Sequence, residues 1–342
     1  RAATKAFSRA FDFRRFLQKT LPAHLGVLPV EDPLAELSPL PPGFDSELRS
    51  RLESWPEASE PVLAGETLAD LPLDHSVPAV DFEGGFIAAE QRLFDFLDGA
   101  FYRYAEDRNH PDESASSGLS PWLHFGHVST HQIFHEIASN EGWSPDRLAE
   151  KANGAREGWW GMSENAEAFL DELVTWREVG FNMCAHNPDY DRYESLPEWA
   201  RKSLELHEAD PREHLYTLEQ LENAETHDRV WNAAQTELLE TGRLQNYLRM
   251  LWGKRILEWT PTAREALRIM IELNNKYAVD GRDPNSYSGI FWVLGRYDRA
   301  WGPERPIFGK IRYMSSANTL RKLRMRDYLA RFGGQAELFD GP

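Results

Sequence analysis

Apolar side chains recur at helical spacing along most of the chain after residue 86. Where apolar residues return every three or four positions, one face of a helix is apolar and can pack against a core. This pattern predicts helices at residues 86–106, 127–140, 165–183, 199–206, 228–241, 244–259, 262–277 and 320–331. Alternation with a period of two, which indicates strands, is almost absent. We therefore expect an all-α domain over residues 84–342.

The first 83 residues follow a different pattern. Phe7, Phe11, Leu17 and Leu21 are spaced as in one amphipathic helix, with basic residues between them. Prolines recur from residue 27 to residue 82, a composition typical of a linker, and one short helix is expected at 46–54. We expect residues 1–83 to form an N-terminal helix and a linker arm.

The composition fits a folded cytoplasmic protein. Of the 342 residues, 41% are hydrophobic and 27% are charged. No apolar run approaches the ~18 residues that a membrane-spanning helix needs, so we expect no membrane partner. A single cysteine, Cys184, excludes an internal disulfide and fits a reducing compartment. We expect a monomer.

Charge is distributed unevenly along the chain. The formal net charge is −17, which by itself argues against binding to a phosphate backbone. Residues 241–342, however, carry 18 Lys and Arg against 10 Asp and Glu, whereas residues 1–240 carry 20 against 45. A basic face on the C-terminal third can still bind a polyanion. The alternative is an ordinary solvated surface.

Tryptophans are concentrated in the most apolar helical region. Trp231, Trp252, Trp259 and Trp292 lie between residues 226 and 314. Trp252 and Trp259 are two helical turns apart on one face, a separation of roughly 10 Å along the axis. Such a cluster indicates a stacked cofactor or an electron path, but the spacing alone favours a core aromatic stripe.

Other local motifs are weaker. His127, His131 and His135 are four residues apart, but the sequence has no cysteine or carboxylate at ligand spacing, so we expect no metal site. No glycine-rich phosphate loop is present. The serine-rich segment 114–121 offers hydroxyl and N–H groups before a helix, which suits a pyrophosphate. In the helix predicted at 165–183, Glu172 shares a face with Trp176 and other apolar residues, and a carboxylate there indicates a pocket or an ion pair.

The chain contains several longer motifs: LSPWLHFGHVS (119–129), TWREVGFNMCAHNPDYD (175–191), THDRVWNAAQ (226–235), LRMLWGKRILEWTP (248–261) and DGRDPN (280–285) with RPIFGKIRYM (305–314). In this order they resemble one family, the class II DNA photolyases of the cryptochrome/photolyase superfamily. The resemblance covers about residues 100 to 335. The resemblance implies an all-α FAD-binding domain and light-driven repair of cyclobutane pyrimidine dimers in DNA by electron transfer from excited reduced FAD.

The resemblance also assigns cofactor residues. It implies that the phosphates and ribityl chain of FAD are held by Tyr104, Ser116, Ser117, Leu119, Ser120 and Arg177. Arg249 and Asp280 match a salt bridge beside the flavin ring, and Asn274 matches the residue that faces its reactive nitrogen. Trp252, Trp231 and Trp259 match the family's photoreduction chain.

Four further residues match contacts to the flipped-out dimer. They are Glu172, Trp176, Met250 and Trp292, and two indoles with a carboxyl group suit the faces and edges of a thymine pair. Damaged DNA is expected to bind the basic C-terminal third through Lys310, Arg312, Arg321, Lys322, Arg324 and Arg326. The alternative function is a cryptochrome-like flavin photoreceptor that has lost repair, but such a sensor has no need to keep these four residues.

The chain departs from the family pattern at a few positions. Ser286, Ile290, Phe291 and Tyr297 replace residues that are usual in the family, and Asn275 replaces a frequent Asp. These changes flank the expected substrate pocket and bear on repair more than on flavin binding. The family's N-terminal α/β antenna domain has no counterpart in these residues, so we expect no antenna chromophore on this chain.

Overall fold

The computed structural model describes residues 3–26, 35 and 45–334, whose regular secondary structure is helical, with turns and loops between the helices. The described part of the chain contains no β-strand, only an isolated bridge between Arg305 and Gly309. The all-α prediction is therefore confirmed. No helix among the described residues is long and apolar enough to cross a membrane.

The chain divides into two units, residues 28–79 and residues 1–27 with 80–342. The smaller unit holds α2 (Asp45–Glu53), α3 (Glu60–Leu63) and the 3₁₀ turn η2 (Leu68–Asp70). The short helix predicted at 46–54 is thus confirmed. Trp55 and Leu63 are exposed in this unit. The domain boundary at residue 83 stays a prediction.

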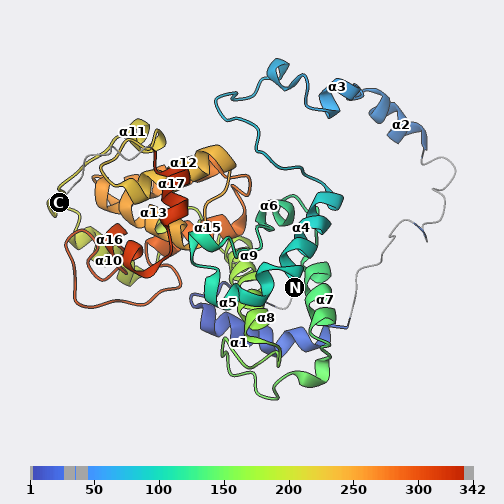
Figure 1. Ribbon diagram of the computed structural model, residues 1–342, viewed down its shortest axis with the longest axis horizontal. Helices are drawn as coiled ribbons and strands as arrows, with labels where there is room; N and C mark the ends of the chain where they lie inside the picture. The colour runs from blue at the N-terminus through green and yellow to red at the C-terminus, as the bar shows by residue number, and fades with distance from the viewer. Residues whose placement is uncertain (1–2, 27–34, 36–44, 335–342) are drawn as a thin grey trace. The chain divides into compact units, whose positions relative to one another are not determined.

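The larger unit begins with α1 (Ala10–Thr20) and continues through two groups of helices (Figure 1). The first group contains α4 (Phe86–Asp98), η3 (Ala100–Arg103), α5 (Tyr104–Asp107), α6 (Ser120–His124), α7 (Thr130–Asn140), α8 (Glu164–Leu170), the π-helical turn η6 (Asp171–Trp176) and α9 (Arg177–His186). The second contains α10 (Glu198–Leu206), α11 (Leu218–Glu222), α12 (Arg229–Thr241), α13 (Asn246–Trp259), α14 (Ala263–Tyr277), α15 (Pro284–Val293), α16 (Ser316–Lys322) and α17 (Arg326–Phe332). Four further short 3₁₀ turns are η1 (Leu21–Ala23), η4 (Pro111–Glu113), η5 (Pro145–Arg147) and η7 (Tyr193–Ser195).

Side-chain caps explain several helix starts. Asp228 accepts the backbone N–H groups of Val230 and Trp231 at the start of α12. Thr262 accepts the N–H of Glu265 at the start of α14, and Ser129 accepts that of Gln132 in α7. Such caps satisfy N–H groups that have no partner inside the helix.

Four of the predicted helices need correction. The helix predicted at 86–106 is interrupted at Gly99, whose backbone (φ −127°, ψ −91°) is not helical. The helix predicted at 165–183 contains the π-helical turn η6. The helix predicted at 127–140 corresponds to α7, which begins at Thr130 and so does not include His127. The helix predicted at 320–331 is two helices, α16 and α17. Helix α15 was not predicted.

Two large apolar cores stabilise the larger unit, one in each group of helices. Helices α12 to α15 enclose the core that contains Trp231, Trp252 and Trp259, and α4 to α8 enclose the other. A small third cluster lies where α9 packs on α15 and is made of Phe13, Val179, Met183 and Tyr297. Gly180 permits this contact, because a Cβ there would lie 2.8 Å from the Pro284 carbonyl oxygen.

Candidate functional site

The turn η6 departs from α-helical hydrogen bonding. The backbone N–H of Arg177 donates to the carbonyl of Glu172, five residues earlier. π-Helical turns inside α-helices are rare and occur frequently at functional sites. This turn carries two of the predicted lesion residues, Glu172 near its start and Trp176 at its end.

Glu172 forms an ion pair, one of the two alternatives that the sequence indicated for it, with a partner that the sequence did not reveal. Its Oε1 lies 2.6 Å from Nη1 of Arg108, just after α5, and both side chains are partly exposed. The Arg108 guanidinium also lies over the Tyr104 ring, 5.4 Å from its centroid. Burial raises the pKa of Glu172 above its ordinary value, although the Arg108 cation acts against this shift. The nearby arginine could not be predicted because it lies 64 residues away in sequence.

Trp176 and Trp292 pack against the same small cluster. Both indoles are partly buried against the third cluster, although one belongs to η6 and the other to α15. Trp176 contacts the edge of Tyr297, with ring centroids 6.5 Å apart. Lys254 and Arg312 place cations over the Trp292 ring, 5.2 and 5.1 Å from its centroid. The structure therefore brings together two residues that are 116 positions apart.

Met250 lies beside the same helix as Trp292. A Cβ on Gly289 of α15 would sit 3.5 Å from the methyl carbon of Met250, which belongs to α13.

Three of the four residues that depart from the family pattern near the expected substrate pocket, Ser286, Ile290 and Phe291, are buried in α15. The fourth, Tyr297, has a left-handed backbone (φ 64°) and a buried ring.

Arg249, Asp280 and Asn274 form one polar group. Nη2 of Arg249 lies 3.6 Å from Oδ1 of Asp280, and Nη1 donates to Oδ1 of Asn274 at 3.4 Å. Asn274 is buried at the end of α14 and donates in turn to Asn275. The three residues come from α13, from α14 and from the loop before α15, so their meeting depends on the packing of these helices.

The serine-rich segment lies beside two arginines. Arg92 donates to the carbonyl oxygens of Ser116 and Ser117, at 3.1 and 2.6 Å. A Cβ at Gly118 (φ 66°) would lie 3.3 Å from Nη1 of Arg243, so that guanidinium adjoins the same turn. Leu119 and Tyr104 are buried nearby in one core, and Ser120 begins α6.

Arg177, another predicted phosphate residue, is engaged locally. Its Nη1 lies 2.7 Å from Oε1 of Glu178, and its guanidinium lies over the Phe181 ring. No hydrogen bond links it to the serine-rich segment in the part of the chain that the structure describes. Its role in cofactor binding stays a prediction.

Among the three core tryptophans, Trp231 contacts both of the others, Trp252 and Trp259. The Trp231 indole N–H donates to the Trp252 carbonyl at 3.0 Å, and the Trp231 and Trp259 rings meet with centroids 5.6 Å apart. All three are buried, but Tyr216 and His227 contact Trp259 and lie nearer the surface. The sequence did not predict these two contacts.

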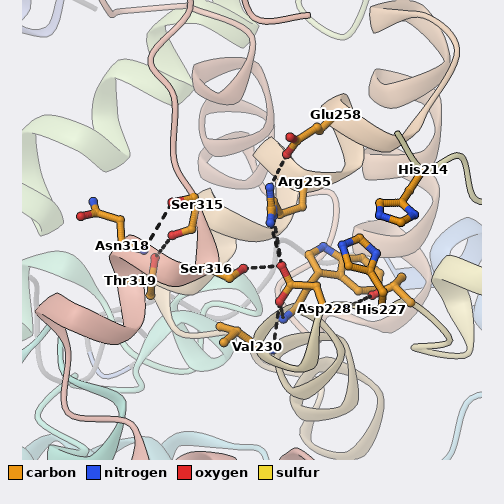
Figure 2. Close-up of polar contacts among 12 residues, drawn as sticks. His214, His227, Asp228, Val230, Arg255, Glu258, Ser315, Ser316, Asn318 and Thr319 are labelled. Atoms are coloured by element: carbon orange, nitrogen blue, oxygen red, sulfur yellow. Dashed lines mark hydrogen bonds and ion pairs between the residues drawn. The ribbon is translucent and has the colours of Figure 1, made fainter. Parts of the chain in front are cut away.

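A buried carboxylate fixes this arrangement. Asp228 caps α12 just before Trp231 and accepts from Nε and Nη2 of Arg255 at 3.1 and 3.0 Å (Figure 2). It also accepts from the Ser316 hydroxyl, so α12, α13 and α16 meet at one side chain. The Arg255 cation lies over the Trp259 ring, 5.2 Å from its centroid.

The predicted DNA-binding residues differ in their partners. Lys310 pairs with Glu304 at 3.2 Å, and Arg312 pairs with Asp298 at the same distance. Arg324 pairs with Asp107 and with Glu113. Lys322 is exposed, and Arg321 donates a long hydrogen bond of 3.4 Å to Asn318.

The histidines of the 124–135 segment have separate surroundings. His124 lies 3.3 Å from Asp283, and Nδ1 of His127 accepts the Gly85 N–H. Within the described residues, no group of three or more His, Cys, Asp or Glu side chains is placed to hold a metal ion.

The chain is similar to curated deoxyribodipyrimidine photo-lyases. It is 43% identical to the rice protein over 272 residues, which are 77% of this chain and 50% of that protein. It is 37% identical to the Arabidopsis thaliana protein over 332 residues, 96% of this chain and 61% of that protein. The chain thus spans about half to three fifths of the length of these relatives. No family model matches the chain.

Solved structures share the fold. A class III photolyase from Agrobacterium tumefaciens superposes with a TM-score of 0.63 at 20% identity, covering 95% of this chain and 57% of its own. A Synechocystis cryptochrome superposes with a TM-score of 0.54 at 18% identity, covering 75% of this chain and 48% of its own. The assignment to class II stays a prediction. The helical fold and the sequence relatives together show that the chain belongs to the cryptochrome/photolyase family.

Proposed function

We propose that this chain is the flavin-binding, catalytic part of a DNA photolyase that repairs cyclobutane pyrimidine dimers with light. The observation that carries the proposal is the meeting of Trp176 and Trp292 at one small cluster, with Glu172 on the same turn as Trp176. The named relatives are deoxyribodipyrimidine photo-lyases, which agrees with this assignment.

The residues around the serine-rich segment fit the phosphates of FAD. The Nε and Nη2 atoms of Arg243 are buried and have no hydrogen-bond partner among the described residues. Burial lowers the pKa of Arg243, and the nearby Arg92 cation lowers it further, while Asp280 raises it. The unpaired donors of Arg243, beside the second guanidinium of Arg92, suit an anionic group. We infer that Arg92, Arg243, Ser116 and Ser117 hold the cofactor's phosphates.

The flavin end of the cofactor would lie near Arg249, Asp280 and Asn274. The Arg249 and Asp280 charges offset each other at 3.6 Å, and the Asn274 amide offers both a donor and an acceptor. When bound, reduced FAD would supply the electron that light transfers to the dimer. The protein's part is to position the two partners and to keep their surroundings fixed.

The lesion residues divide this work among themselves. The indoles of Trp176 and Trp292 offer apolar faces to a pyrimidine pair that has left the base stack. The raised pKa of Glu172 makes its protonated form more accessible, and a protonated carboxyl can donate a hydrogen bond to a base carbonyl. Arg108 holds this side chain in place through its ion pair.

A repair assay tests the proposal. Purified chain, loaded with FAD and chemically reduced, is illuminated with an oligonucleotide that contains one thymine dimer, and restored thymines are counted. We expect light-dependent repair, and we expect Trp292→Ala to lower it by at least tenfold, because half of the aromatic contact is lost. Bound FAD without repair in the unmodified chain would favour the photoreceptor alternative instead.

A further inference from the structure

Helix α1 reaches the π-helical turn through a buried ion pair. Nε and Nη2 of Arg14 lie 2.7 and 3.0 Å from Oδ1 and Oδ2 of Asp171, the first residue of η6. The Arg14 and Asp171 side chains are only 13% and 4% exposed. A bidentate contact of this kind fixes the orientation of the guanidinium and the carboxylate as well as the distance between them.

Further hydrogen bonds hold α1 itself in position. The Gln18 amide accepts the Gly154 N–H at 2.7 Å and donates to the Ala155 carbonyl at 2.9 Å. Gly154 has a left-handed backbone (φ 81°), and a Cβ there would lie 3.0 Å from the Phe11 carbonyl oxygen. The helix therefore cannot slide along this loop without losing buried hydrogen bonds.

The residues around Arg14 also support Trp176. Phe13 is one of the four buried residues in the cluster against which Trp176 packs. Phe7 and Phe16 extend this contact, with ring centroids 5.3 Å apart. The backbone N–H of Phe7 donates to Asn182 of α9 at 2.9 Å, so the segment before α1 is attached to the same helix pair.

A π-helical turn needs such external support. Its geometry is less favourable than that of an α-helix, so the same residues would otherwise return to regular hydrogen bonding and rotate the side chains that follow. Asp171 also lies next to Glu172, whose pKa it raises. The Arg14 cation offsets the charge of Asp171 and holds the first residue of the turn.

We propose that α1 is part of the lesion-binding site, and that Arg14 is a positioning residue that fixes η6 so that Glu172 and Trp176 face the lesion. This inference rests on the proposed function. It adds a residue that lies 157 positions from Asp171 in the sequence and is not among the predicted cofactor-binding residues. Arg14 acts through Asp171, without contact to the substrate.

The test compares variants in α1 and at its start. Arg14→Ala removes the buried ion pair, and Arg14→Lys keeps the charge but loses the second hydrogen bond of the bidentate contact. Arg9→Ala, at the residue before α1, removes the exposed Arg9–Asp12 pair and is the matched control. Each full-length variant is loaded with FAD. Affinity is measured for a short single-stranded oligonucleotide with one thymine dimer and for the undamaged oligonucleotide. Hydrogen exchange is followed at the amides of residues 171–177.

We expect Arg14→Ala to weaken binding of the damaged oligonucleotide by about tenfold, to leave binding of the undamaged one and FAD content unchanged, and to speed exchange in η6. Arg14→Lys should fall between Arg14→Ala and the unmodified chain, and Arg9→Ala should match the unmodified chain. If Arg14→Ala does not fold, Arg14→Lys decides. A folded Arg14 variant with unchanged dimer binding and unchanged exchange would overturn the inference. If the unmodified chain itself does not bind the dimer, the proposed function fails. The hydrogen-exchange result still tests whether the Arg14–Asp171 ion pair holds η6 in place.

Discussion

Lys254 is a buried lysine whose amine contacts no carboxylate among the described residues. It is fully buried in α13, and its Nζ donates to the Val293 carbonyl at 2.5 Å, near the end of α15. Burial lowers its pKa to about 7; the Asp298 charge raises the pKa and the Arg312 charge lowers it. The carbonyl contact compensates only part of the lost hydration, because the residues that the structure describes offer the Lys254 amine no ion pair.

This lysine should make stability depend on pH. In the unfolded chain its pKa is near the ordinary 10.5, so between pH 7 and that value the unfolded chain binds more protons than the folded one. The free energy of unfolding therefore rises with pH in this window, by at most about 1.4 kcal/mol per unit. Urea unfolding from pH 7 to 9 should show this rise, and Lys254→Met should reduce it. Lys202→Met, at an exposed pair with Glu198, is the control. Equal slopes in all three proteins would contradict the assignment.

Trp252 is the tryptophan that links α13 to the buried amide of Gln235. Its indole N–H donates to Gln235 at 2.8 Å, and its carbonyl accepts from Trp231. If these indoles carry electrons, Trp252→Phe should slow photoreduction of bound oxidised FAD about tenfold. Repair by chemically reduced protein should stay near normal. Both rates are measured by absorbance under blue light. Trp143→Phe, in the other core, should alter neither rate. Equal loss of both activities in Trp252→Phe would refute the electron-transfer role.

At the scale of helices, periodicity predicted those that expose one polar face. Helix α14 is such a case, because its apolar positions recur regularly and Thr262 caps it. Helix α15 was missed because serines and a glycine alternate with its apolar residues, and both of these serines are buried together with Ile290, Phe291 and Val293, so no polar face marks the helix. Its start signal, Asp283 before Pro284, was present in the sequence.

Functional geometry was harder to predict than helices. The turn η6 was read as ordinary α-helix, because local propensity does not distinguish the two forms. Arg108 and Arg14 contact the site from 64 and 157 residues away, and one sequence gives no signal for such pairs. Glu172 could be singled out because a carboxylate in an apolar stripe needs an explanation.

The contact of α9 with α15 should be sensitive to a single methyl group. A Cβ at Gly180 would lie 2.7 Å from the Ser288 hydroxyl and 2.8 Å from the Pro284 carbonyl oxygen, so the helices would have to separate. We expect Gly180→Ala to lower the free energy of unfolding by about 1–3 kcal/mol. Gly289→Ala is the matched control, because its Cβ would meet Met250 at an ordinary 3.5 Å. Chemical denaturation measures both, and a Gly180→Ala variant as stable as the control would contradict the close contact.

At the scale of the molecule, part of the basic charge of the C-terminal third is neutralised by carboxylates. Arg324 pairs with Asp107 of α5 and with Glu113 of η4, and Arg312 pairs with Asp298. These cations therefore stabilise the fold and are less available to DNA. The net charge of −17 further limits binding to phosphates outside this face.

Binding to DNA should thus depend on a few exposed cations. Lys322 is exposed on α16, and its ammonium can replace counterions at a phosphate. We expect Lys322→Ala to weaken binding to damaged and undamaged duplexes alike, and to reduce the slope of log K against log salt by about one. Compared with Lys322→Ala, Arg324→Ala should change the salt slope less and lower the free energy of unfolding more, because it leaves Asp107 and Glu113 without this partner. Lys151→Ala, exposed outside the basic third, should leave the slope unchanged. Titrations at several salt concentrations measure these slopes. A larger change of slope in Lys151→Ala than in Lys322→Ala would contradict a DNA-binding face on the C-terminal third.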